Sequence, residues 1–214
     1  MPKRKGILGT GEHYHIFNRG VEKRIIFEDA REYNHFLEVI QFYQRNHRFR
    51  FSRLRRKERQ KVIANKTGEL LIEILCYCLM PNHFHFLIKQ VAEKGIETFL
   101  QRITNSYSHY FNIKHDRVGP LFQGKFRSIR IENTAQLIHV SRYIHINPVT
   151  AYIVKKPEDY RWSSYQEYLK MAEGFCEKGM ILNQFSGIDS YQQFVNDMVD
   201  FNKNLERIKH LAID

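Results

Sequence analysis

The sequence predicts an α+β fold, with one largely antiparallel sheet and helices packed on a face of it. Two observations support this class. Segments with alternating apolar residues and segments with helical apolar spacing follow one another as strand, helix, two strands, helix, strand, helix. The chain has 214 residues, 43% of them apolar and 14% aromatic, which is enough for one domain with a core and an appendage. The element order matches the split βαβ, or ferredoxin-like, plan.

The first half of the chain supplies a strand, a helix and a strand pair. Residues 13–19 alternate as a strand does. Residues 29–47 carry apolar side chains at helical spacing, and Asp29 is the expected N-cap. Residues 69–90 are expected to form two strands that reverse at a turn dipeptide beginning at Pro81.

The second half supplies two helices, a strand pair and an extension. Residues 96–115 are expected to form a helix, and residues 119–131 a hairpin. A third helix is expected to begin at Asn133 and to end at Asn147, because Pro148 disfavours helical geometry in the residue before it. The chain beyond this helix is expected to form a helical C-terminal extension.

The charge of the chain indicates a polyanionic partner. Its formal net charge is +11, which is large for this length and favours nucleic acid. Residues 45–61 hold nine Lys or Arg residues against one acid, and this segment is interpreted either as a DNA-facing arm or as a charged, mobile insertion. We expect a main domain over 1–152, with a basic insertion at about 48–66, and a C-terminal extension over 153–214.

The cysteine count and the hydropathy pattern indicate a cytoplasmic protein. Three cysteines suit reduced thiols and do not suggest a disulfide framework. The basic N-terminus is not followed by an apolar run, so no signal peptide is expected. No stretch of 18 apolar residues occurs, so no membrane span is expected.

Two histidines stand two residues apart in an otherwise apolar strand. Because side chains at i and i+2 of a strand point the same way, His83 and His85 share one face, while Phe84 faces the other layer. Two neutral imidazoles on one face can ligate a divalent cation. The alternative is that both are partly buried residues satisfied by hydrogen bonds. His13 and His15 repeat the spacing and form a rival pair, but no partner motif follows them.

The third helix offers the groups that would complete such a site. Steps of four residues place His139, Tyr143 and Asn147 on one helical face. A cation held by His83, His85 and Asn147 would polarise a phosphodiester oxygen, and Tyr143 would attack the phosphorus. The alternative is that Tyr143, one of twelve tyrosines, is a packing or surface residue.

These motifs together resemble a known family. His83-Phe84-His85 is similar to the histidine–hydrophobe–histidine signature of the HUH nucleases, whose sheet is ferredoxin-like and RRM-like. The wider pattern over about 13–168 resembles the REP-associated tyrosine transposases, relatives of small insertion-sequence transposases. The segments that carry it are YHIFNRGVEKRIIF, MPNHFHFLI, GPLFQGKFRS, SRYIHINPV and PEDYRWSSY.

The resemblance implies a transposase-like endonuclease that cleaves and rejoins single-stranded DNA beside hairpins through a 5′-phosphotyrosine. It makes Tyr143 the nucleophile and implies Mg²⁺ or Mn²⁺ held by His83, His85 and Asn147. His139 shares the helical face of Tyr143 and could accept its proton; the alternative is a histidine that only faces solvent. The protein would be a monomer or a homodimer, associated with the nucleoid when DNA is bound. The expected DNA contacts are basic side chains: Arg19, Arg53, Arg55, Arg56, Lys125, Arg127 and Arg130.

Two other functions compete with this reading. Cys76 and Cys78 precede His83 and His85, so a zinc-stabilised nucleic-acid-binding module is conceivable, although C-x-C spacing is unusual for structural zinc. A hairpin-binding protein that has lost the chemistry is the other alternative.

Overall fold

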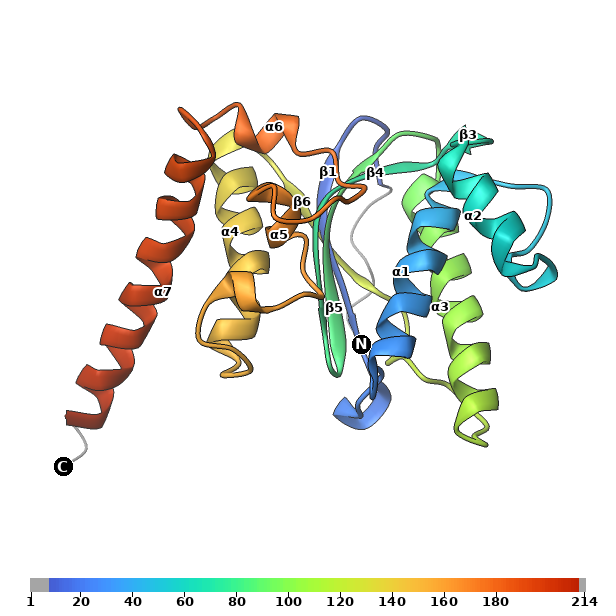
Figure 1. Ribbon diagram of the computed structural model, residues 1–214, viewed down its shortest axis with the longest axis horizontal. Coiled ribbons are helices and arrows are strands. Elements are labelled where there is room, and N and C mark those ends of the chain that lie inside the picture. The colour runs from blue at the N-terminus through green and yellow to red at the C-terminus, as the bar shows by residue number, and fades with distance from the viewer. Residues whose placement is uncertain (1–7, 212–214) are drawn as a thin grey trace.

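The predicted α+β class is confirmed. The computed structural model describes the backbone of residues 8–211 and the side chains of residues 8–199. A four-stranded antiparallel sheet in the order β4-β5-β1-β6 stands between two helical layers (Figure 1). The strands are β1 (His13–Arg19), β4 (Ile72–Met80), β5 (His83–Gln90) and β6 (Arg127–Ile131).

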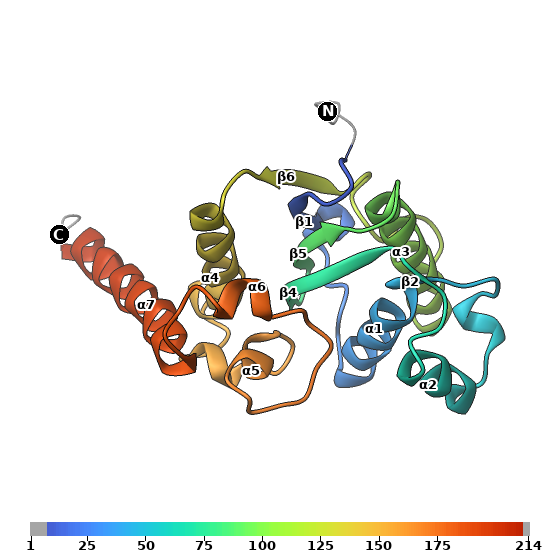
Figure 2. The ribbon, with the colours of Figure 1, turned by 90° about the horizontal axis from the view of Figure 1, so that it is seen from above.

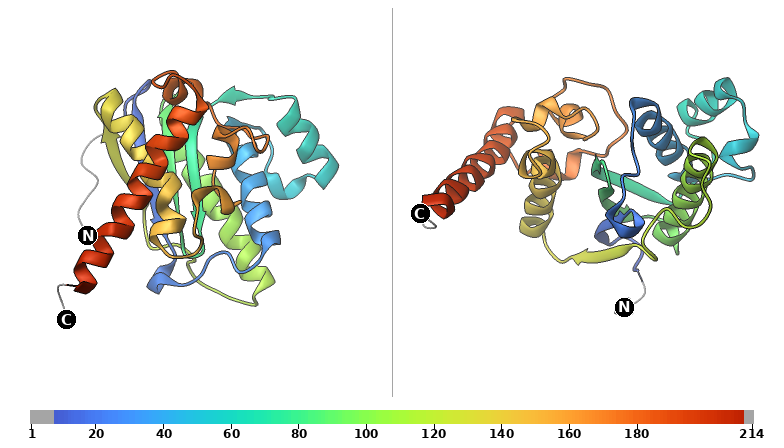
Figure 3. Two further views of the ribbon diagram at one scale, coloured as in Figure 1. Left: turned by 60° about the vertical axis from the view of Figure 1, so that its left-hand side comes forward. Right: turned by 90° about the horizontal axis from the view of Figure 1, so that it is seen from below.

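Helices cover both faces of the sheet, whereas the sequence analysis had placed them on one. The helices α1 (Ala30–Tyr43) and α3 (Gly95–Lys114) pack on one face, and α4 (Thr134–Thr150) packs on the other (Figure 2). Beyond α4 lie three further helices, α5 (Tyr165–Tyr168), α6 (Gly179–Leu182) and α7 (Ile188–Leu211). Figure 3 shows α7 running alongside α4.

A small subdomain interrupts the chain between α1 and β4. It consists of a two-stranded ribbon, β2 (Arg45–Asn46) with β3 (Glu69–Leu70), and the helix α2 (Arg56–Ala64). Three short 3₁₀ turns complete the inventory: Val21–Lys23, Phe51–Arg53 and Pro157–Asp159.

Local capping explains where α1 begins and ends. Asp29 is the N-cap, as predicted, and its carboxylate accepts hydrogen bonds from the backbone N–H groups of Arg31 and Glu32. The helix ends at Tyr43 and not at residue 47, because the chain then enters the ribbon, where Arg45 pairs with Leu70.

Two local predictions in the second half were wrong. Residues 119–131 do not form a hairpin, since only β6 is a strand and it pairs with β1, which lies far away in the sequence. The helix α4 continues through Pro148 to Thr150. Pro148 is buried, and the helix goes on around it with Ala151 N–H donating to the carbonyl of Asn147, so packing outweighs the local preference.

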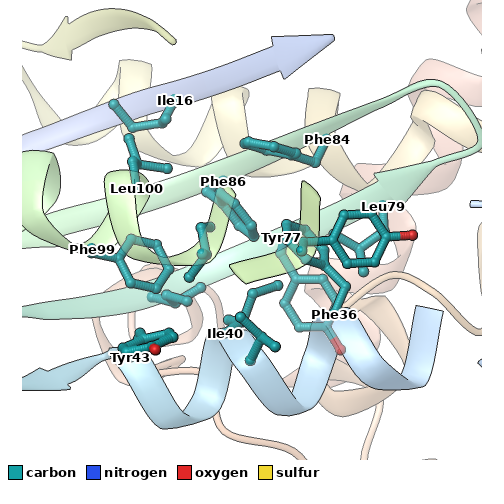
Figure 4. Packing of buried hydrophobic residues seen from close by; sticks show 14 of the residues in the cluster. Ile16, Phe36, Ile40, Tyr43, Tyr77, Leu79, Phe84, Phe86, Phe99 and Leu100 are labelled. Carbon is teal, nitrogen blue, oxygen red and sulfur yellow. The ribbon is translucent and has the colours of Figure 1, made fainter. Parts of the chain in front are cut away.

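The sheet divides the apolar residues into two cores. On one face, β-strand side chains such as Ile16, Phe84 and Phe86 pack against Phe36 of α1 and Phe99 of α3 (Figure 4). On the other face, a second cluster joins β4 and β5 to α4, α5 and α7. A β-bulge between residues 74 and 76 shifts the alternation of β4. The side chains after the bulge therefore face the opposite core from the one that uninterrupted alternation would give.

The segment that was expected to be helical after α4 partly serves as an edge strand instead. Leu79 N–H donates to the carbonyl of Trp162 at 2.9 Å, and Ser164 N–H donates to the carbonyl of Tyr77 at 3.0 Å. The Tyr160 hydroxyl donates to the carbonyl of Leu79 at 2.7 Å. These bonds cover the free edge of β4, which would otherwise expose unpaired backbone groups. In the part of the chain that is described, no helix is long and apolar enough to cross a membrane.

Candidate active site

The histidine pair lies on the sheet face that α4 covers. β5 runs between β4 and β1, and its residues alternate between the two cores. Phe84 and Phe86 belong to the core under α1 and α3, as the strand period predicted. His83 and His85 therefore face α4, and their ring centroids lie 4.9 Å apart.

The helix α4 brings its predicted groups to the same place. The Tyr143 ring lies edge-on to the His85 ring, with centroids 5.6 Å apart. The Asn147 side chain, one turn further along α4, lies beside the His83 ring, and its interaction with the ring opposes the lowering of the His83 pKa. Tyr143 is 48% exposed, so its side chain is open to solvent. One chain thus brings these four groups together without help from a second copy.

Both imidazoles are anchored through the same ring nitrogen. His83 Nδ1 lies 2.6 Å from Asn82 Oδ1, and His85 Nδ1 lies 3.0 Å from His15 Nε2. An amide oxygen can only accept, so His83 carries its proton on Nδ1. In the same tautomer His85 would donate from Nδ1 to His15, and the Nε2 lone pair of each ring would be left to act as a ligand. Metal-binding histidines are oriented in this way, with the second ring nitrogen held by a neighbour.

Burial keeps these histidines neutral. It lowers the pKa of His85 to about 2, with a further contribution from the neighbouring rings, and that of His15 to about 4. Burial, followed by the positive charge of Arg19, also lowers the pKa of His83 to about 4. At neutral pH all three rings are therefore uncharged, which is the form that binds a cation.

A buried polar chain fixes α4 relative to the sheet. His145, which lies fully buried between Tyr143 and Asn147 on α4, has its Nδ1 2.7 Å from the Tyr191 hydroxyl and its Nε2 2.9 Å from Ser164 Oγ. Ser164 Oγ in turn accepts from the backbone N–H of Tyr77 on β4 at 2.9 Å. α7, α4 and β4 are thereby connected through hydrogen bonds, which sets the position of α4 over the histidine pair.

His139 is exposed on α4 and contacts Arg142 and α7. Its Nδ1 accepts a hydrogen bond of 2.8 Å from an Arg142 guanidinium nitrogen, and its ring lies 5.6 Å from Phe194 of α7. The lone pair of neutral His139 is therefore already engaged, and it can take a proton from Tyr143 only after the contact with Arg142 breaks. This geometry disfavours His139 as the base.

The predicted DNA contacts fall into separate groups. Arg19 is exposed opposite His83 in the strand register, so it borders the site. Arg127 is exposed on the same sheet face, whereas Arg130 lies on the other face and binds Glu12 at 2.8 Å. Lys125 is exposed in the loop before β6, and Arg53, Arg55 and Arg56 are exposed in the segment between β2 and β3.

The side chains fit a catalytic divalent cation with open coordination positions better than they fit a structural zinc ion. Two imidazole nitrogens and the amide oxygen of Asn147 can provide three ligands and leave positions open for substrate. Burial raises the pKa of the Cys76 and Cys78 thiols, so they stay protonated. Among the residues that the structure describes, no three His, Cys, Asp or Glu side chains are arranged to hold a metal ion.

The sequence analysis missed the residues that orient the pair. His15 was seen only as part of a rival pair with His13, and Asn82 only as a turn residue. The signal for His15 was its spacing on a strand, but its pairing register with β5 cannot be read from the chain alone. His13 does not contact the site rings, and its Nε2 is buried without a hydrogen-bond partner.

Comparison with known proteins relates the chain to transposases. Residues 34–147 match the family model for IS200-like transposases, a segment that includes the histidine pair and ends at Asn147. No curated protein matches the chain. Among solved structures, a REP-associated tyrosine transposase bound to a REP hairpin matches with a TM-score of 0.57 at 17% identity, covering 79% of this chain and 86% of that one. A putative transposase from Deinococcus radiodurans matches with a TM-score of 0.35 at 12% identity, over 67% of this chain and 95% of that one.

The solved REP-associated transposase establishes the likeness of fold, and the family match covers more than half of the 214 residues. The matched segment contains the histidine pair, the tyrosine and the asparagine that the fold brings together. The chain therefore belongs to the family of IS200-like transposases.

Proposed function

We propose that the protein cleaves and rejoins single-stranded DNA beside hairpins, with Tyr143 as the nucleophile. The observation that carries the proposal is the approach of Tyr143 to His85, and of Asn147 to His83, on one sheet face. A half-exposed phenol next to two oriented, neutral imidazoles is an arrangement suited to phosphoryl transfer. The hairpin bound by the structurally similar transposase makes hairpin DNA the first substrate to test.

We assign the cation site to His83, His85 and Asn147, and the cation to Mg²⁺ or Mn²⁺. When bound, it would polarise a phosphodiester oxygen and neutralise developing charge. His15 and Asn82 engage Nδ1 of the two rings, which would leave their Nε2 atoms to ligate the cation. Arg19, at the border of the site, contributes a positive charge for a neighbouring phosphate.

The step is a transfer of the phosphoryl group to the tyrosine. The Tyr143 hydroxyl loses its proton, and its oxygen attacks the phosphorus. The bond from phosphorus to the 3′ oxygen breaks, and that oxygen takes up a proton as a free 3′-hydroxyl. The 5′ phosphate stays on Tyr143 as a phosphodiester, so attack by a 3′-hydroxyl can reverse the step and join strands without ATP.

The site is complete within one chain, so a monomer can carry it. We also propose that residues 1–152 form the catalytic unit and residues 153–214 an extension that supports it. The contact between Tyr191 of α7 and His145 of α4 supports this division of roles. Size-exclusion chromatography with light scattering, with and without DNA, measures the oligomeric state directly.

Incubation with a labelled hairpin oligonucleotide and Mn²⁺, followed by a denaturing gel, tests the chemistry. The wild type should give a covalent adduct, and Tyr143→Phe should give none. The variant should bind the hairpin with the affinity of the wild type, because only a hydroxyl is lost. His83→Ala and His85→Ala should also lose cleavage with any divalent metal. A wild type that binds the hairpin and forms no adduct would instead favour a binding protein without chemistry.

A further inference from the structure

The positive charge of the protein is concentrated in one short segment. Residues 45–68, here called the basic arm, contain ten Lys or Arg residues and one acid, a net charge of +9. The rest of the chain contains the other 24 basic and 22 acidic residues, a net charge of +2, which completes the total of +11. The excess that indicates a polyanionic partner therefore lies in the arm and not around the active site.

The basic arm is a folded element. Its ribbon, β2 with β3, joins it to the sheet, and Phe51 is buried against the core with its N–H donating to the Tyr43 hydroxyl at 3.1 Å. The Arg59 guanidinium lies 4.2 Å from the centre of the Phe51 ring and 3.6 Å from Glu38 of α1. These contacts attach the arm to α1 and hold its backbone there.

Most of the arm's cations are free to bind a ligand. Arg45 and Arg59 are engaged, because Arg45 donates to the carbonyl of Gly68 and Arg59 contacts Phe51 and Glu38. The other eight are exposed and form no ion pair with any described residue: Arg48, Arg50, Arg53, Arg55, Arg56, Lys57, Lys61 and Lys66.

The arm lies on the other side of the sheet from Tyr143. The helix α2 is attached to α1, in the layer opposite α4 (Figure 1, Figure 2). A nucleotide strand at Tyr143 therefore occupies a different face of the molecule from any DNA on the arm. The DNA held there must flank the cleaved strand.

The side chains of the arm suit paired DNA better than unpaired DNA. Single-strand binding relies on aromatic rings on which bases stack. Within the arm, Phe49 is the one exposed phenylalanine, at 43% exposure, while Phe51 is buried. A field of guanidinium and ammonium groups with a single exposed phenyl ring matches the closely spaced phosphates of a duplex, which it binds without reading sequence.

We infer that the basic arm is a second DNA-binding surface, which holds the phosphate backbone of the base-paired stem that flanks the strand at Tyr143. This inference rests on the proposed function for the identity of the DNA as a hairpin. It requires that changes in the arm affect the affinity for DNA and not the chemical step. The arm contributes cations for binding and contributes none of the side chains that surround His85.

Fluorescence anisotropy with the full-length protein and a labelled hairpin, over a series of KCl concentrations, tests the inference. The variant Arg53→Gln/Arg55→Gln/Arg56→Gln removes three of the free cations. Each lost phosphate contact should reduce the slope of log affinity against log salt by about 0.9, so the slope should fall by about 2 to 3. Affinity in 0.15 M KCl should fall by about ten- to hundredfold.

A matched control removes the same charge elsewhere. Lys155→Gln/Lys156→Gln/Lys170→Gln replaces three exposed lysines on the α4 side of the sheet and should leave the slope within about 0.5 of the wild type. Circular dichroism checks that both triple variants fold. An unpaired oligonucleotide of equal length should bind the arm variant and the wild type with affinities that differ by less than about threefold.

Adduct formation on a short unpaired substrate, at saturating DNA, separates this inference from the proposed function. The wild type and the control variant Lys155→Gln/Lys156→Gln/Lys170→Gln should both form the Tyr143 adduct at the same rate. An unchanged salt slope in the arm variant, or an equal loss of affinity for unpaired DNA, would overturn the assignment to the duplex stem. Failure of the wild type to form any adduct would overturn the proposed chemistry. The difference in salt slope between the arm variant and the wild type would still test the DNA-binding role of the arm.

Discussion

Replacement of His15 tests whether the second histidine of the pair is held in its ligand tautomer by a neighbour. His15 is buried on β1, and its Nε2 lies 3.0 Å from His85 Nδ1. In His15→Phe the ring volume is kept but the acceptor is lost. His85 Nδ1–H is then buried without a partner, which costs about 1 to 3 kcal/mol. The ring can avoid that cost only by turning or by moving its proton to Nε2, and either change removes the ligand.

This cost translates into cation affinity. At about 1.4 kcal/mol for each factor of ten, the loss corresponds to roughly five- to 150-fold, and outer-shell partners of metal-binding histidines typically contribute about ten- to hundredfold. We therefore expect His15→Phe to weaken Mn²⁺ binding by about ten- to hundredfold, measured by electron paramagnetic resonance of free Mn²⁺ at pH 7. His15→Gln, whose side chain can still accept a hydrogen bond, should recover most of the affinity.

His13→Phe is the matched control. His13 lies two residues earlier on the same face of β1, and its Nε2 makes no hydrogen bond. This variant should bind Mn²⁺ within about threefold of the wild type. Equal weakening in the His13 and His15 variants would refute the orienting role, since the effect would then come from disturbed packing of the strand. Unchanged affinity in His15→Phe would refute it as well.

Three further variants test the supports of the site and of the fold. Tyr191→Phe leaves the buried Nδ1 of His145 without its hydrogen-bond partner, so the free energy of unfolding in urea should fall by about 1 to 3 kcal/mol; an unchanged midpoint would show that the hydrogen bonds from α7 to α4 contribute nothing to stability. Burial raises the pKa of Glu32, but hydrogen bonds from the Glu28 N–H, Lys114 and His115 outweigh burial and leave this pKa lowered. The ionised Glu32 carboxylate therefore stabilises the fold above the ordinary carboxyl pKa, and this stabilisation is lost as the pH falls through the lowered pKa. Glu32→Gln should therefore destabilise by about 2 kcal/mol at pH 7 and by much less in strong acid, and a difference that does not depend on pH would contradict this. His139→Gln should slow adduct formation less than about tenfold, whereas loss of a general base would cost about 10² to 10⁴.

The sequence was most informative where a repeat period decides the structure. The strand period placed His83 and His85 on one face and Phe84 on the other, and steps of four placed Tyr143 and Asn147 on one side of a helix. These relations are local, so they hold whatever the helix packs on. Asp29 and Asn133 as N-caps were predictable for the same reason, since each side chain bonds backbone groups within three residues.

What could not be predicted depends on contacts between distant segments. The strand β6 has its partner in β1, so the expected hairpin partner inside 119–131 does not exist. Whether Pro148 ends α4 depends on the core around it, and packing outweighed the local preference. The link between His15 and His85 arises from strand register. The placement of the charged arm behind α1, away from Tyr143, is likewise a property of the fold.

The central claim is that Tyr143 becomes bonded to DNA, and mass spectrometry of the adduct tests it most directly. Trypsin cleavage after Arg142 and Lys155 releases Tyr143 on a peptide that also contains Tyr152, which is 72% exposed against 48% for Tyr143. After nuclease digestion of the adduct, fragmentation should place the remaining nucleotide on Tyr143. A nucleotide on the more exposed Tyr152, or on a tyrosine outside this peptide, would contradict the account.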